Sequence, residues 1–166
     1  MIYVLVEGAD DKRFVNKVLS PILKEKYGGY KVWEYAKKKD VAINNFIKSI
    51  NSMGSDCLFL VDSDNNEADE IKKKYLTKFS QLQEEKISVV LREIEAWYLS
   101  GINEDTFTNK LSKKIPADTS HITKEMFETY FMRLTGTEAK IESLINYDVH
   151  LACQRSPSFK DLLYRF

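Results

Sequence analysis

Short apolar runs alternate with segments of helical periodicity through the first half of the chain. Strands are predicted at residues 2–6, 58–62 and 87–91, which are largely continuous apolar runs, and at residues 30–35, where apolar and polar residues alternate. Between them, apolar residues recur with the spacing of amphipathic helices, at residues 10–27, 40–53 and 67–85. Pro21 is expected to kink or divide the first of these helices. The predicted order is therefore β-α-β-α-β-α-β, for which right-handed crossovers favour a parallel sheet covered by helices on both faces.

The expected fold is an α/β, Rossmann-like core with a four-stranded parallel sheet. Strand order 2-1-3-4 would place the first and third strands side by side where the strand order reverses, and open α/β sheets bind ligands there. Beyond Arg92 the pattern is helical, with segments at residues 93–100, 105–115, 124–134, 138–145 and 157–166. We therefore predict a core over residues 1–100 and a helical cap over residues 101–166, packed on the core as one structural unit.

Composition narrows the class of protein only partly. The chain has 166 residues, of which 43% are hydrophobic and 12% aromatic, enough for the packed core of one ordinary domain. Twenty-five Lys and Arg balance 25 Asp and Glu, and this neutral total neither supports nor excludes a nucleic-acid partner because charge can be segregated into patches. Cys57 and Cys153 are isolated, which argues against a thiolate metal site or a disulfide framework. With no long apolar run or leader-like start, a cytoplasmic protein without a membrane span is expected.

Carboxylates follow two of the predicted strands directly. Glu7 and Asp11 follow the first strand within E-G-A-D-D, and Asp62 and Asp64 end the third within D-S-D. Because the carboxyl ends of parallel strands share one edge, these acids would crowd together, which is costly unless cations bind there. Carboxylate oxygens suit Mg²⁺ or Mn²⁺. The plainer alternative is an Asp-rich turn that caps the next helix, since Asp64 and Asn65 are both good turn residues.

These motifs resemble those of a known family. The pairing of E-G-A-D-D with D-S-D resembles the TOPRIM domain of topoisomerases, bacterial primases and nucleases, and Glu7-Gly8-x-x-Asp11 is similar to the form found in the overcoming-lysogenisation-defect nucleases. R-E-I-E-A-W at residues 92–97 and S-P-S-F at residues 156–159 resemble signatures of a small, uncharacterised TOPRIM-like family. The resemblance spans most of the chain and is weakest in the cap, at residues 101–147.

The resemblance implies a metal-dependent nuclease acting on DNA or RNA. Glu7 would bind metal or transfer protons at the scissile phosphate, Asp62 and Asp64 would bind Mg²⁺, and Asp11 would join a second metal site. Two metals can stabilise both the attacking and the leaving oxygen of a phosphodiester displacement. Nucleases of this type are commonly fused to, or encoded beside, an ABC-type ATPase. This chain has no Gly-x-x-x-x-Gly-Lys-Ser/Thr loop of its own, so such a partner is expected in a defence or repair complex.

Further charged residues have two interpretations each. Glu95 precedes apolar residues, and a buried acid there needs a partner such as Arg92 or a metal, so we predict a catalytic role for Glu95 as a ligand or supporting acid. Glu93 is a weaker candidate, because an acid at a helix start already favours the helix dipole. Lys160 could neutralise charge on a phosphate, and the basic run at residues 37–39 could contact a phosphate backbone. Both also suit ordinary solvated positions.

Two other classes of function remain. A haloacid-dehalogenase-like phosphatase also places Asp-x-Asp at a strand end, but normally after the first strand rather than the third. A receiver-like phosphoacceptor fits Glu7 and the second acid, Asp64, poorly. The non-enzyme alternative is a catalytically weak TOPRIM-like module that binds nucleic acid or a partner protein. The sequence leaves the oligomeric state and the choice between DNA and RNA open.

Overall fold

The chain divides into two compact units in its computed structural model, which describes residues 1–107 and 109–166. Met1–Val89 and Phe166 form the first unit, and Val90–Arg165 form the second. The structure thus places the division before the predicted boundary at residue 100. Arg92, Glu93 and Glu95 consequently belong to the second unit, and the packing of a cap on the core stays a prediction.

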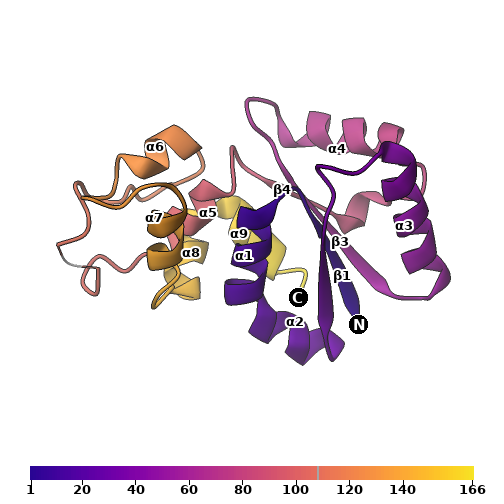
Figure 1. The fold of residues 1–166 in the computed structure, drawn as a ribbon, viewed down its shortest axis with the longest axis horizontal. Coiled ribbons are helices and arrows are strands. Elements are labelled where there is room, and N and C mark those ends of the chain that lie inside the picture. Colours follow the sequence, from indigo (N-terminus) through magenta and orange to yellow (C-terminus); the bar gives the residue numbers. More distant parts are fainter. Residues whose placement is uncertain (108) are drawn as a thin grey trace. The chain divides into compact units, whose positions relative to one another are not determined.

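Four parallel strands form one sheet in the predicted order β2-β1-β3-β4 (Figure 1). Ile2 of β1 lies opposite Tyr30 of β2 on one side and opposite Asp56 of β3 on the other. The strands are β1 at Ile2–Val6, β2 at Tyr30–Glu34, β3 at Asp56–Asp62 and β4 at Ile87–Val90. Since β1 and β3 are neighbours and run in the same direction, the residues that follow them meet at one edge of the sheet.

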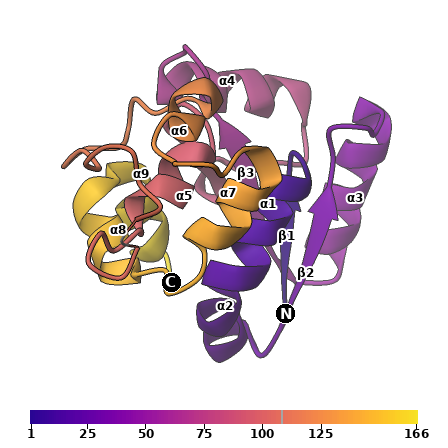
Figure 2. The ribbon, with the colours of Figure 1, turned by 60° about the vertical axis from the view of Figure 1, so that its left-hand side comes forward.

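Helices cover both faces of this sheet (Figures 1 and 2). One face carries α3 at Asp40–Ser52 and α4 at Ala68–Lys78. The other carries α1 at Ala9–Phe14, a π-helical turn at Val15–Leu19 and α2 at Ser20–Tyr27. Alternate strand residues such as Leu5 and Phe59 pack with the apolar stripe of α3, which comprises Ile43, Ile47 and Ile50. The predicted Rossmann-like α/β class is confirmed.

Pro21 divides the first helical segment, as predicted. It lies in the first turn of α2, directly after the π-helical turn at Val15–Leu19. A proline inside an α-helix lacks the N–H donor, and its ring clashes with the carbonyl group four residues earlier. The wider π turn accommodates this mismatch without ending the helical path.

The predicted helix at residues 67–85 is too long. α4 ends at Lys78, and Phe79 has an extended backbone with φ −123° and ψ 96°. Phe79 and Leu82 are both buried in the core, so the chain turns inward instead of continuing along the surface. A 3₁₀ turn at Glu84–Lys86 then leads into β4.

The second unit is built around α5, Glu95–Ser100, all of whose residues are buried. α6, α7 and α8 pack against it, and α9 packs against α8. Their bounds are Lys124–Glu128, Gly136–Ser143, Val149–Arg155 and, for α9, Pro157–Leu163. The indole Nε1 of Trp97 donates to Ser158 Oγ at 2.9 Å, and its ring lies 5.3 Å from that of Phe159. The R-E-I-E-A-W and S-P-S-F segments, far apart in the sequence, are therefore packing partners.

Sequence patterns predict the second unit less well. The helix expected at residues 105–115 is wrong, because the described residues there form turns and Leu111 pairs with Phe131 in an isolated antiparallel bridge. This bridge also explains why the helix expected at residues 124–134 is only α6. Sequence analysis missed α8, whose first turn is capped by the Asp148 side chain through the Leu151 N–H.

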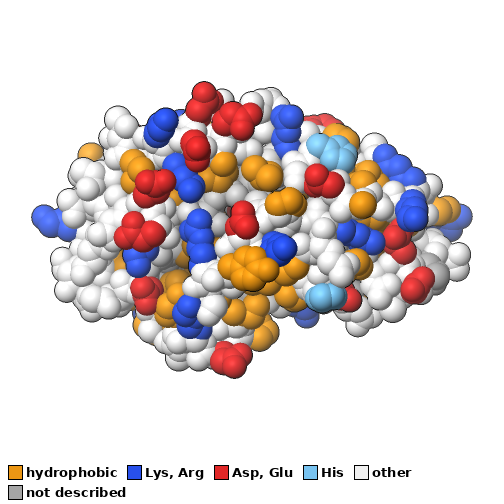
Figure 3. Space-filling model, turned by 180° about the vertical axis from the view of Figure 1, so that it is seen from behind, with side chains coloured by type: hydrophobic (Ala, Val, Ile, Leu, Met, Phe, Trp, Pro, Cys, Tyr) orange, Lys and Arg blue, Asp and Glu red, His pale blue; other side chains and the backbone are white. Residues whose placement is uncertain are grey.

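Lysine, arginine, aspartate and glutamate side chains are interspersed on the face drawn in Figure 3, and neither sign of charge gathers there. Among residues 1–107 and 109–166, no helix has the length and apolarity needed to cross a membrane.

Candidate active site

Glu7 is held at the carboxyl edge of the sheet by backbone pairing that continues beyond β2. The Tyr35 N–H donates to Val6 O at 2.9 Å, and the Ala36 N–H donates to Glu7 O at 3.2 Å. Glu7 remains accessible to solvent, although protein surrounds part of its carboxylate. Its backbone is thus fixed by the sheet while its carboxylate can change rotamer.

Asp62 and Asp64 lie on the neighbouring strand end. Asp62 is the last residue of β3 and is partly buried, whereas Asp64 is exposed and has a left-handed backbone with φ 52°. Asp64 lies within a turn from Ser63 to Asn66, which is closed by the backbone N–H and the side-chain amide of Asn66, both donating to Ser63 O, at 2.9 and 3.2 Å. The N-cap position of α4 belongs to Glu67. The two aspartates are therefore not the N-cap of this helix, and the plainer capping alternative loses support.

The electrostatics couple Glu7 to this neighbouring turn. The pKa of Glu7 is raised, first because surrounding protein removes water from its carboxylate and second because the Asp64 carboxylate repels a second negative charge. The Lys74 ammonium on α4 acts in the opposite direction and lowers the pKa. Two acids and one lysine thus influence one another at this edge.

Two tyrosines, which sequence analysis missed, lie beside these acids. The Tyr35 hydroxyl donates to Leu60 O at 2.9 Å, and its ring stacks on Phe59 at 4.7 Å. Burial is the main cause that raises the pKa of both Tyr35 and Tyr75, and the Glu7 carboxylate raises both further. Both hydroxyls therefore stay protonated at neutral pH. Tyr35 directly follows the second strand, at the same edge of the sheet as Glu7. Its position at a strand end could therefore have identified it from the sequence as a neighbour of the acids.

Asp11 has a structural role at the start of α1. Its Oδ2 accepts the Gly8 N–H at 3.0 Å, and the side chain is buried. Such a contact satisfies a donor that the first helical turn leaves without a partner. The adjacent Asp10 forms an ion pair with Arg13. A role for Asp11 at a second metal stays a prediction.

The donor set suits a hard divalent cation. Glu7, Asp62 and Asp64 offer only carboxylate oxygens, which are the ligands that Mg²⁺ and Mn²⁺ prefer. Within the described residues, no three His, Cys, Asp or Glu side chains already stand close enough together to hold a metal. Glu7 and Asp64 are both exposed, so their side chains have room to change rotamer.

The remaining predicted site residues belong to the second unit. Glu95 Oε1 lies 2.5 Å from Lys140 Nζ, and the two side chains are only 6% and 3% exposed. Glu93 accepts the backbone N–H of Lys124, the first residue of α6. Arg92 has a left-handed backbone with φ 64°, and the exposed Lys160 lies 5.6 Å from the ring of Tyr164. Glu95 thus has a lysine partner, and any catalytic part for these four residues stays a prediction.

We expect Glu7→Gln to stabilise the metal-free protein as pH rises. The pKa of Glu7 is raised in the folded state, so protonated Glu7 adds stability at pH values below its unfolded pKa, and this contribution is lost as pH rises through the folded pKa. Glutamine does not ionise, so the variant does not lose stability in this way as pH rises. Thermal unfolding in EDTA should show equal melting temperatures at low pH and a higher one for the variant near neutrality.

The exposed Glu25 on α2 provides the matched control, since Glu25→Gln makes the same chemical change away from the strand ends. Its melting temperature should follow that of the unmodified protein at every pH. A lower melting temperature for Glu7→Gln near neutral pH would contradict the interpretation and show that Glu7 has a structural role.

Comparisons with known proteins assign neither a family nor a function to the chain. The chain matches no model of a known family, no curated protein and no solved structure. The resemblance to TOPRIM proteins therefore depends on the sequence motifs alone, which are E-G-A-D-D, D-S-D and the segments at residues 92–97 and 156–159. The functional argument depends on the chemistry of these side chains.

Proposed function

We propose that the protein is a metal-dependent nuclease in which Glu7, Asp62 and Asp64 bind Mg²⁺ or Mn²⁺ at the phosphate of a nucleic acid. One observation carries the proposal: acids end the neighbouring parallel strands β1 and β3, and the Asp64 charge raises the pKa of Glu7. A divalent cation would remove this repulsion. The resemblance to TOPRIM nucleases supports the same assignment.

Each side chain has a distinct chemical part in this proposal. When bound, the metal supplies an activated water and stabilises charge on the phosphate. Asp62 and Asp64 would hold it at the end of β3. Glu7, whose pKa is raised by burial and by the Asp64 charge, would exchange a proton with water or the leaving oxygen. The protonated Tyr75 hydroxyl and the Lys74 ammonium would offer a hydrogen bond and a positive charge to phosphate oxygens.

The resemblance also supports an ABC-type ATPase as a partner. A chain that depends on this ATPase for turnover would bind nucleic acid alone and cleave it only in the complex. The second candidate function, a TOPRIM-like binding module, differs from the first only in lacking this turnover.

The test is cleavage of labelled single-stranded and duplex DNA and RNA by the purified chain, with and without the ATPase. Mg²⁺ and Mn²⁺ should support cleavage, and EDTA should abolish it. Ca²⁺ should bind but support little turnover, because its coordination is larger and less rigid. Lack of cleavage with every substrate, metal and partner would refute the nuclease and leave the binding module.

A further inference from the structure

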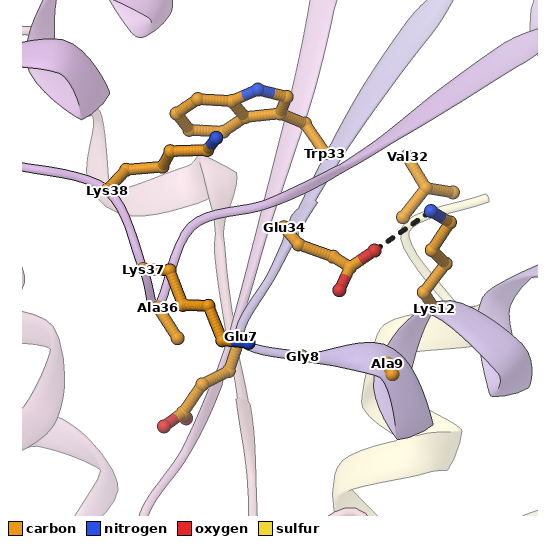
Figure 4. A pocket seen from close by; sticks show the side chains of 10 residues that line it. All are labelled: Glu7, Gly8, Ala9, Lys12, Val32, Trp33, Glu34, Ala36, Lys37 and Lys38. Carbon is orange, nitrogen blue, oxygen red and sulfur yellow. Dashed lines mark hydrogen bonds and ion pairs between the residues drawn. The ribbon is translucent and has the colours of Figure 1, made fainter.

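A groove opens beside the candidate active site, between the end of β2 and the start of α1. Its volume is about 460 Å³, within the range of roughly 300–1,000 Å³ typical of ligand pockets. Gly8 and Trp33 line it together with three lysines, Lys12, Lys37 and Lys38 (Figure 4). Glu7 also borders the groove, but its carboxylate points away from the other lining side chains.

Charge in the groove is unevenly neutralised. Lys12 Nζ lies 2.8 Å from Glu34 Oε1, so the charge of Lys12 is neutralised by this carboxylate. Lys37 and Lys38 are exposed, and the described part of the chain supplies no ion pair to either of them. Figure 4 shows Lys37 reaching toward the Glu7–Gly8 segment and Lys38 reaching toward Trp33. The groove therefore presents two cations suited to an anionic ligand.

Trp33 supplies a fixed aromatic surface next to these cations. Its ring centroid lies 4.4 Å from that of Phe46 on α3, so the indole is anchored on one side by the core. The side chain is only partly buried and lines the groove. An anchored aromatic ring beside lysines is the arrangement with which proteins stack unpaired bases and hold the adjoining phosphates.

We propose that this groove binds an unpaired nucleotide of a single-stranded nucleic acid, with its base on Trp33 and its phosphates on Lys37 and Lys38. The proposal builds on the proposed function, since Glu7 borders the same groove and a strand held there would lie beside the acids. A simple phosphate would make no use of the indole. A duplex keeps its base faces stacked and would reach only the lysines.

The first experiment measures binding without turnover, in EDTA. A fluorescently labelled oligothymidylate should bind more tightly than a duplex of equal length and should quench the fluorescence of Trp33. Trp97 is fully buried in the second unit, so its emission should not change, and quenching should disappear in Trp33→Phe. Thymidine monophosphate tests for a free-nucleotide site, and binding as tight as that of the oligomer would overturn the strand proposal.

The second experiment separates stacking from charge. Lys37→Gln/Lys38→Gln should lower the slope of log affinity against log salt by about 1.4, the value for two lost phosphate contacts on a single strand. Trp33→Leu should weaken binding about five-fold or more at every salt concentration, while Trp33→Phe should retain much of the affinity. Lys24→Gln/Lys48→Gln removes the same charge from exposed helical positions outside the groove and should have a smaller effect on the slope.

The outcomes distinguish this proposal from the nuclease assignment. Equal affinity for duplex and single strands, or equal salt slopes in the two lysine variants, would overturn the groove proposal even in an active nuclease. Quenching and a reduced slope without any cleavage would support the groove and refute the nuclease. Circular dichroism melting of each variant keeps a folding defect from being mistaken for lost binding.

Discussion

Lys140→Met is expected to lower the free energy of unfolding of the second unit by about 3–5 kcal/mol, because it leaves a buried carboxylate without its cation. The Glu95 side chain is 6% exposed and lies on α5, whose residues are all buried. The Trp97 side chain lies two residues along the same helix. Urea unfolding followed by Trp97 fluorescence in a Trp33→Phe background would measure the change directly.

A second ion pair in the same unit provides the control. Lys110 Nζ and Glu142 Oε2 are also 2.5 Å apart, but their side chains are 50% and 27% exposed. Lys110→Met should therefore cost only about 0–1 kcal/mol. Glu95→Leu/Lys140→Met should recover much of the loss, since it removes both charges from the interior. A small effect of Lys140→Met alone would mean that Glu95 is satisfied by another group, which would favour its predicted metal role.

If the protein is the proposed nuclease, Asp62→Asn and Glu7→Gln should each reduce metal-dependent cleavage by about a hundred-fold or more, since each would remove a metal ligand or a proton-transfer group. Single-turnover cleavage with enzyme in excess measures this step apart from substrate binding. Glu7→Gln should show the paradoxical combination of lost activity and raised stability in EDTA. That combination is typical of a functional acid held against repulsion.

Asp69→Asn is the matched control for the aspartate variant. Asp69 is exposed in the first turn of α4, close in sequence to the D-S-D motif but outside it. Its variant should cleave at the unmodified rate. Cleavage that persists equally in Asp62→Asn and Glu7→Gln would place the activity at another site or in a contaminant.

The sheet and its acidic edge could be predicted because their determinants are local. The run that ends at Asp62 is apolar on both faces, and it stops at residues that cannot continue a buried strand. The same holds for β1 and Glu7. Once the strand order is 2-1-3-4, parallel pairing alone brings these two strand ends together.

The surroundings of other candidate residues depend on contacts that the sequence does not encode locally. Nothing near Glu95 indicates that its partner would be Lys140 on α7, since both the acid and the lysine are of types that usually lie at the surface. Tyr75 belongs to the apolar stripe of α4, and only the packing of that helix shows its hydroxyl near Glu7. The helix predicted at residues 105–115 is wrong for a related reason, because the bridge between Leu111 and Phe131 overrides the local helical propensity.

The left-handed backbone at Asp64 limits how this position can evolve. Glycine, asparagine and aspartate adopt φ near 52° readily, whereas other residues pay roughly 1–2 kcal/mol for the crowding of Cβ against the following carbonyl. Replacing Asp64 by asparagine or glycine would therefore keep the turn intact while removing the proposed metal ligand. The backbone at position 64 thus favours aspartate, asparagine and glycine, although the same chain also holds an arginine in the left-handed region, at Arg92.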